Sequence, residues 1–214
     1  MYLKEGEEKI INYFSNDKNL DLLEKESNYP VIYSEKSFFP DNKYDEFKEP
    51  LDLRPENTWT LKLEEIDTFE LIEVHIINSI VPFIFASKLK KLMEKSEFKD
   101  KFIINVSSSE GQFSYPNKST YHPHNNMSKA SLNMLTRTSA NDYAENNIFI
   151  NSIDVGWVSS GNPFEKKQRL EDDGFVHPLD LIDAAARIYD PIIQGILGNI
   201  FYGKLIKNYK EVDW

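Results

Sequence analysis

The sequence has no cysteine and no long uncharged run. Without cysteine the chain forms neither disulfides nor thiolate sites, which suits a reducing compartment. The longest uncharged stretch, residues 75–87, is well short of the ~20 apolar residues that cross a bilayer. Residues 1–18 are charged and show no targeting pattern. These absences predict a cytoplasmic protein with no membrane association.

Basic residues are also fewer than acidic ones. The chain has 25 Lys and Arg against 35 Asp and Glu, a net charge of −10. Nucleic-acid binding needs clustered positive charge, so we expect no nucleic-acid partner. His122 and His124 have no further His or Cys cluster beside them and predict no metal site.

Glycine is scarce where one class of fold needs it. The chain has eight glycines, and none lies between Gly6 and Gly111. A dinucleotide-binding fold uses a glycine-rich turn after its first strand to bring the backbone close to the pyrophosphate. No early apolar strand precedes such a turn here either. The sequence therefore predicts that the nucleotide-holding half of such a fold is missing from this chain.

A βαβ pattern is what the sequence does contain. Residues 102–106 form an apolar run that ends in three serines, residues 124–146 have helical character, and residues 148–154 form a second apolar run. A strand, a crossover helix and a parallel strand bring polar groups to the carboxyl ends of the strands, where ligands bind in open α/β sheets.

Three motifs in this stretch resemble the short-chain dehydrogenase/reductase family. Residues 105–111 fit its Asn-x-Ser-Ser-x-x-Gly strand end, residues 129–133 fit the Lys-Ala-Ser-Leu-Asn helix, and residues 155–158 stand where the family has Pro-Gly-x-Val. The resemblance covers residues 51–214. It implies an α/β fold, the C-terminal part of a Rossmann-like doubly wound parallel sheet that lacks the glycine-rich N-terminal nucleotide-binding half.

The resemblance also implies a set of site residues. Ser108 matches the catalytic serine, which hydrogen-bonds the substrate carbonyl oxygen, and Ser109 is the alternative. Lys129 matches the lysine that binds the nicotinamide ribose and lowers the pKa of a tyrosine. Gly156 and Val158 match cofactor-binding positions. The implied cofactor is NAD or NADP, and the implied substrate is a small carbonyl compound or alcohol. Serines after a strand also simply cap loop backbone.

The family tyrosine is missing from its position four residues before Lys129. Asn125 stands there and has no titratable proton. Tyr121 is the candidate replacement, although Pro123 places it in the loop before the helix. His124 is a second possible proton donor. Residues 122–129 resemble a subgroup of the family with His-Pro-His-x-Asn-Met-x-Lys in place of the tyrosine motif.

A helix over residues 67–95 is predicted, with Asp67 and Glu70 as a capping box. Its apolar residues cover more than one face, so we expect it to be largely buried. Pro82 has no N–H to donate to the carbonyl of Asn78. In the family an asparagine at this point anchors a water that connects to the catalytic lysine, so Asn78 is a candidate site residue. The alternative is a simple proline kink.

The predicted organisation has two parts. Residues 1–50 form a peripheral segment, with short helices over residues 7–23 and an extended piece at residues 29–33. Residues 51–214 form the half-domain, with strands at 102–106, 148–154 and 199–203 and helices at 67–95, 124–146 and 179–190. The first strand is left as a bare edge, which can pair with another chain, and we expect either the N-terminal segment or a second polypeptide to cover it.

Two functions fit these observations. The first is an oxidoreductase half that acts only when another chain supplies the nucleotide-binding half. The second is a degenerate homologue that serves as a non-catalytic binding or scaffolding module. In the family, helices matching 67–95 and 124–146 form a four-helix dimer interface. The expected partner is therefore a second copy or a complementing N-terminal half, and we do not expect the chain alone to bind NAD(P).

Overall fold

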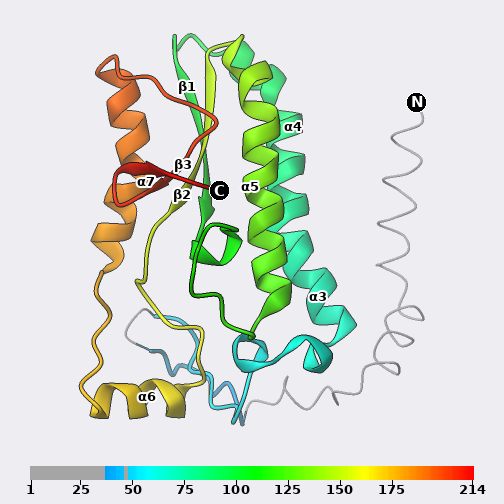
Figure 1. The fold of residues 1–214 in the computed structure, drawn as a ribbon, viewed down its shortest axis with the longest axis vertical. Coiled ribbons are helices and arrows are strands. Elements are labelled where there is room, and N and C mark those ends of the chain that lie inside the picture. The colour runs from blue at the N-terminus through cyan, green and yellow to red at the C-terminus, as the bar shows by residue number, and fades with distance from the viewer. Residues whose placement is uncertain (1–36, 46–47) are drawn as a thin grey trace.

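A computed structural model of the chain describes residues 37–45 and 48–214. The short helices expected over residues 7–23 and the extended piece at residues 29–33 lie outside the described residues. Figure 1 shows one sheet with helices on both faces. Its strands, in spatial order, are β1 (Lys101–Ser107), β2 (Ile148–Asp154), β3 (Leu205–Lys207) and β4 (Lys210–Val212). The first three strands are parallel, and β4 returns antiparallel to β3.

The α-helices lie on the faces of this sheet, except for one that lies below it in Figure 1. They are α3 (Thr68–His75), α4 (Val81–Glu94), α5 (Pro123–Ala144), α6 (Phe164–Asp172) and α7 (Leu181–Ile196). A π-helical segment, Ile76–Ile80, joins α3 to α4. Helices α4 and α5 cover one face of the sheet, and α7 covers the other (Figure 1). This arrangement confirms the predicted α/β fold with a mainly parallel sheet.

The two strands of the predicted βαβ unit are confirmed. Every residue of β2 is buried, including its polar ones. The hydroxyl of Thr136 on α5 accepts hydrogen bonds from Asn105 Nδ2 and Ser152 Oγ, each at 2.8 Å. Polar groups can be buried here because each finds a partner. The same bonds hold α5 against both strands.

The C-terminal part differs from its prediction. The strand expected at residues 199–203 is wrong, because regular pairing with β2 begins only at Leu205. Gly203 has a φ of +65°, outside the extended range, and the strand starts after it. The helix predicted to end at residue 190 continues to Ile196, with Pro191 inside it. It stops just before Gly198, whose φ is +96°.

The N-terminus of α3 forms only half of the predicted capping box. Asp67 caps the helix by accepting a hydrogen bond from the Phe69 N–H at 2.8 Å. Glu70 does not close the box. Its carboxylate accepts a hydrogen bond from Thr58 Oγ1 at 2.8 Å and so ties the helix to the preceding loop.

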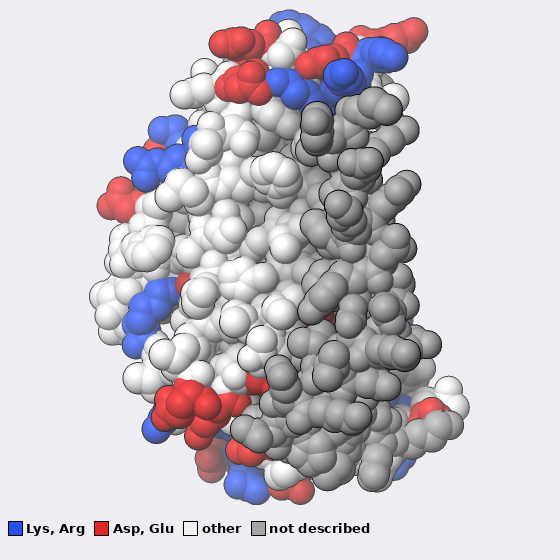
Figure 2. All heavy atoms as spheres, turned by 90° about the vertical axis from the view of Figure 1, so that its right-hand side faces the viewer, with Lys and Arg blue, Asp and Glu red and all other residues white. Residues whose placement is uncertain are grey.

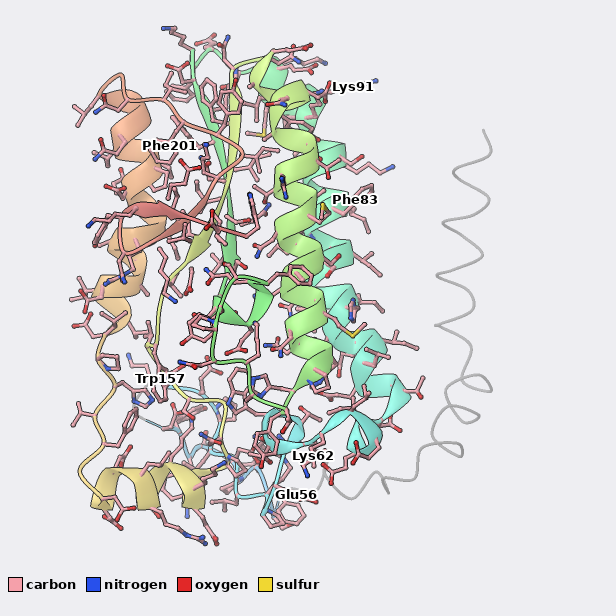
Figure 3. All side chains as sticks on the ribbon, viewed as in Figure 1. Glu56, Lys62, Phe83, Lys91, Trp157 and Phe201 are labelled. Carbon is pink, nitrogen blue, oxygen red and sulfur yellow. The ribbon has the colours of Figure 1, made fainter. Side chains whose placement is uncertain are left out.

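The expectation that the helical stretch at residues 67–95 is largely buried is wrong. Phe83, Phe85 and Leu92 are 58%, 60% and 65% exposed. The sheet and α5 contact only part of the helix surface, and Figure 3 shows Phe83 pointing away from the sheet. The stretch Thr68–Glu94 is long and apolar enough to cross a membrane by length and composition alone, with 11% of its most apolar window buried. An apolar surface of this kind usually marks an interaction site.

Candidate functional site

The carboxyl ends of β1 and β2 lie side by side. Ser107, the last residue of β1, is in register with Asp154, the last residue of β2. Ser107 is only 2% exposed, and its hydroxyl has no hydrogen-bond partner within the described ranges. The three consecutive serines therefore begin at the edge where the fold gathers its polar side chains.

Ser108 lies immediately beyond β1 and is partly exposed. It is the N-cap of a short 3₁₀ turn, Ser109–Gly111, and its Oγ accepts a hydrogen bond from the Glu110 N–H at 3.3 Å. The capping alternative is thus present in the structure. It does not use the hydroxyl proton, which Ser108 can still donate to a ligand oxygen.

Ser109 has a different environment. Its Oγ donates to Asp154 Oδ2 at 2.9 Å and accepts from Lys207 Nζ at 2.6 Å. Lys207 and Asp154 also form an ion pair at 2.9 Å, and Asp154 is only 1% exposed. Because the proton of Ser109 is already donated, the geometry favours Ser108 as the hydroxyl that can bind a ligand.

Gly111 lets the 3₁₀ turn lie directly against α5. A Cβ added to Gly111 would lie 2.7 Å from the carbonyl carbon of Lys129 and 2.8 Å from its oxygen. These are backbone atoms within a helix and cannot rotate away. Asn133 Nδ2 also donates to Gly111 O at 3.0 Å. The close approach fixes the loop carrying Ser108 against the helix carrying Lys129.

We expect Gly111→Ala to lower the free energy of unfolding by about 1–3 kcal/mol, since overpacking against fixed backbone costs about that much. Urea denaturation followed by circular dichroism measures the change. Ser131→Ala, on the exposed side of α5, is the control and should change stability by less than ~0.5 kcal/mol. A Gly111→Ala midpoint equal to that of the unmodified chain would contradict this role.

Lys129 reaches back from α5 to β1. Its Nζ donates to Val106 O at 3.1 Å, two residues before Ser108. Burial lowers the pKa of Lys129 from its ordinary value. No carboxylate forms an ion pair with Lys129 in the part of the chain that the structure describes. Lys129 and Ser108 thus come together at the end of one strand.

Asn78 lies in the π-helical segment and faces α5. Its Nδ2 donates to Ser128 Oγ at 3.3 Å, and the neighbouring Ser79 Oγ donates to Ser128 O at 2.9 Å. Ser128 is fully buried and directly precedes Lys129. Asn78 and Lys129 also line the same pocket. The family role of Asn78 in water binding stays a prediction.

Asn125 and Tyr121 lie on either side of the start of α5. Asn125 is in the first turn, four residues before Lys129, where the family has its tyrosine. Tyr121 lies in the preceding loop, as expected, and is 43% exposed. Its N–H donates to Ser119 Oγ at 3.3 Å, and among the described residues no hydrogen bond joins it to Ser108 or Lys129. Its role as proton donor stays a prediction.

His122 contacts the Trp59 ring, the Trp59 carbonyl and the Glu110 carboxylate, a set of contacts that the sequence did not predict. Its ring stacks on Trp59 with centroids 4.0 Å apart. Nδ1 lies 2.8 Å from Trp59 O, and Nε2 lies 3.3 Å from Glu110 Oε2. Both partners are acceptors, so both bonds form together only in the doubly protonated ring. The hydrogen bond between His122 Nε2 and Glu110 lowers the pKa of Glu110. The same contact gives the acid in the serine loop a structural role.

His124 points to a different part of the molecule. Its ring is 4% exposed, and Nε2 lies 3.8 Å from Glu70 Oε1 on α3. Burial lowers the pKa of His124, which favours the neutral imidazole. Among the described residues no three His, Cys, Asp or Glu side chains converge as a metal site.

Gly156 and Val158 follow β2 at the other side of the serine loop. Gly156 has a φ of +83° and donates its N–H to Asp154 Oδ1 at 2.9 Å. Val158 is 9% exposed. Between them Trp157 is 51% exposed and packs against Phe175, with ring centroids 4.7 Å apart. The positive φ of Gly156 turns the chain just after the end of β2.

Sequence reasoning missed three residues that shape this site: Asp154, Lys207 and Trp59. Asp154 had a signal, since it is an acid at the end of a mainly apolar run. Lys207, at the end of β3, and Trp59, in a 3₁₀ turn, had none, because their place at the site is set by the whole fold.

Comparison with known proteins places these features in context. Residues 58–173, more than half of the chain, match the family described as enoyl-(acyl carrier protein) reductase. The carbonyl reductase Sniffer of D. melanogaster aligns with a TM-score of 0.53 at 20% identity, over 78% of this chain and 64% of that one. The Pseudomonas aeruginosa RhlG/NADP complex aligns with a TM-score of 0.54 at 22% identity, over 71% and 61%.

A further relative comes from a virus. An uncharacterized protein of Acanthamoeba polyphaga mimivirus is 34% identical over 148 residues, which are 66% of this chain and 31% of that protein. The chain thus spans less than two thirds of each of these relatives. The structural similarities, all at low identity, concern the fold.

Proposed function

Because the chain belongs to the short-chain dehydrogenase/reductase family, we propose that it carries the substrate half of an NAD(P)-dependent carbonyl reductase. The observation that carries the proposal is the contact of Lys129 Nζ with Val106 O, two residues before Ser108. It supports a site in which an amine and a donor hydroxyl meet at a strand end. In this proposal residues 51–214 form the half-domain, and the protein works in the cytoplasm.

The nucleotide fits this chain only at its nicotinamide end. Lys129 would hold the ribose, and Gly156 and Val158 would lie along the nicotinamide. Within the described residues no glycine precedes Gly111 to bring backbone to a pyrophosphate. Bound NAD(P)H supplies hydride. A complementing half, from a second polypeptide or from another segment, would hold the rest of the nucleotide.

The residues of this chain would act on the substrate oxygen. Ser108 donates its proton in a hydrogen bond to the carbonyl oxygen, which polarises the carbonyl. Lys129 places positive charge near the oxygen as negative charge develops there. Asn125 cannot transfer a proton, and His124 is buried beside Glu70. We therefore propose Tyr121 as the proton donor. The exposed loop that carries Tyr121 would move to bring its hydroxyl to the substrate oxygen.

The test is NADPH oxidation with a panel of small aldehydes and ketones. The chain is assayed alone and co-expressed with a polypeptide that carries a glycine-rich nucleotide-binding half. The proposal predicts turnover only when both are present. No turnover in a mixture that forms a stable complex would contradict it.

A second function is favoured by one observation, the asparagine in the place of the family tyrosine. A chain without its general acid can retain the fold and serve as a non-catalytic binding or scaffolding module. This alternative predicts stable complex formation with no hydride transfer to any carbonyl compound. The assay above separates the two.

We propose in addition that α3, α4 and α5 pair with a second copy of the chain. The apolar residues on this face are exposed and come from both helical stretches, including Phe83 on α4 and Met134 on α5, at 58% and 55%. In Figure 2 the described residues on this side of the molecule form a broad uncharged area, with charged residues at its two ends and along one edge. Covering such a surface removes apolar area from water.

A further inference from the structure

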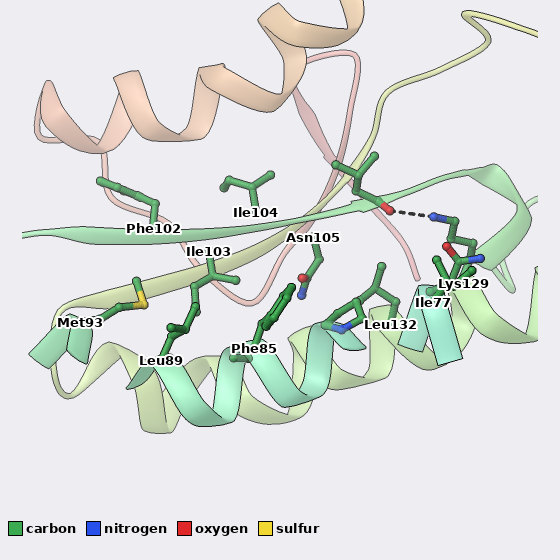
Figure 4. Close-up of a pocket in the computed structure, with 14 residues that line it drawn as sticks. Ile77, Phe85, Leu89, Met93, Phe102, Ile103, Ile104, Asn105, Lys129 and Leu132 are labelled. Atoms are coloured by element: carbon green, nitrogen blue, oxygen red, sulfur yellow. Dashed lines mark hydrogen bonds between the residues drawn. The ribbon is translucent and has the colours of Figure 1, made fainter. Parts of the chain in front are cut away.

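An elongated apolar pocket of about 570 Å³ lies between α4 and the edge of β1. Its volume is in the range of small-molecule sites, ~300–1,000 Å³. Figure 4 shows Met93 and Phe102 at one end of the pocket and Lys129 at the other. Phe85 and Leu89 form part of the wall between them. Asn78 and Asn105 are the other polar residues of the lining, and the rest of it is apolar.

Lys129 is the only titratable side chain among the residues that line this pocket. Its Nζ donates to the Val106 carbonyl. Within residues 37–45 and 48–214 no acid forms an ion pair with it. Desolvation lowers the pKa of Lys129, so more of the amine is neutral than at a surface lysine. Neutral lysine amines in apolar pockets are the nucleophiles that form Schiff bases.

We propose that Lys129 forms an imine with linear aliphatic aldehydes whose chains occupy this pocket. The lone pair of Nζ forms a bond to the carbonyl carbon. The carbonyl oxygen then leaves as water with both amine hydrogens, and a C=N bond remains. The pocket favours a ligand with one carbonyl and an unbranched apolar tail, because Lys129 lies at one end and most of the remaining lining is apolar. The reaction requires neither nucleotide nor metal.

This inference does not rest on the proposed reductase function, since it concerns the chain alone. The experiment exposes the chain to octanal or propanal with sodium cyanoborohydride, which reduces the imine to a stable secondary amine. Intact mass and peptide mapping locate the adducts. We expect octanal to modify Lys129 at least ~10-fold faster than the exposed Lys91 of α4 and at least ~10-fold faster than propanal does, because only octanal buries a long tail.

Two variants serve as controls. Lys129→Arg keeps the positive charge but cannot form the imine, so the main octanal adduct should disappear. Leu89→Gln changes a pocket residue that is 44% exposed. It should lower the octanal rate at Lys129 by a larger factor than the propanal rate, because only the octanal tail reaches this wall. Equal labelling of Lys129 and Lys91, or equal rates for octanal and propanal at Lys129, would overturn the proposal without any variant. Either result would leave the reductase proposal intact.

Discussion

In the complemented reductase, Ser108→Ala and Lys129→Met are each expected to lower the rate of carbonyl reduction on the order of 10²-fold or more. Loss of a positioned hydrogen-bond donor or charged group at a reacting oxygen has effects of this size. Ser108 is partly exposed with its proton available, and Lys129 lies at the same strand end. The measurement is steady-state NADPH oxidation with each variant, after circular dichroism has confirmed its fold.

Asn125 is the matched control in this series, since it lies one helical turn from Lys129 and has no proton to transfer. Asn125→Ala should change the rate by less than about tenfold. Asn125→Tyr should raise it, because a phenol one turn from Lys129 restores the family arrangement. Equal collapse of the Ser108, Lys129 and Asn125 variants with the fold intact would show that the helix has been aligned wrongly. An unchanged Ser108→Ala rate would rule out the family chemistry.

The second large effect concerns self-association. We expect the chain to sediment as a dimer at micromolar concentration and the double variant Phe83→Glu, Met134→Glu to sediment as a monomer. Both residues are more than half exposed on the apolar face. A carboxylate buried without a partner is strongly unfavourable, so the dissociation constant should rise by at least ~10³-fold, equivalent to about 4 kcal/mol.

Gln168→Glu on α6 is the control for added charge, because Gln168 is exposed and lies on a helix outside the α3, α4 and α5 face. It should leave the dimer unchanged. A clean, soluble monomer of the unmodified chain at these concentrations would count against the dimer.

The strands and helices that define the site were predictable because local pattern determines them. Residues 102–106 and 148–154 are short apolar runs bounded by polar residues, and β1 and β2 coincide with them. The strand at residues 199–203 was wrong for a related reason. An apolar run resembles a strand whether or not it pairs, and the backbone of Gly203 delays pairing until Leu205.

Burial was less predictable than helix position. The apolar residues of α4 suggested a core helix, yet Phe85 and Leu92 are exposed in the single chain. A hydrophobic pattern predicts that a helix face is buried against other residues. It does not predict whether those residues belong to the same chain or to a partner. The pattern at residues 67–95 is therefore as consistent with an intermolecular interface as with a core.

Within the site, the sequence located residues but not their partners. It identified Ser108 and Lys129 through motif spacing, and the structure brings both to the end of β1. It favoured Ser108 over Ser109 by motif position alone, and the contact that occupies the Ser109 proton comes from Asp154, 45 residues away. The acid at Glu110 likewise gains a reason only from its contact with His122. Such pairings arise from the tertiary fold.

The central claim is that this chain carries the substrate half of the enzyme and that another half holds the nucleotide. The most direct test is a fluorescence titration of the chain with NADH and NADPH. Without a glycine-rich turn before Gly111, the chain alone should bind either nucleotide with a dissociation constant above ~100 μM, which corresponds to at most about −5.5 kcal/mol. Adding the complementing nucleotide-binding half should bring the constant below that value. A dissociation constant well below ~100 μM for the chain alone would contradict the account.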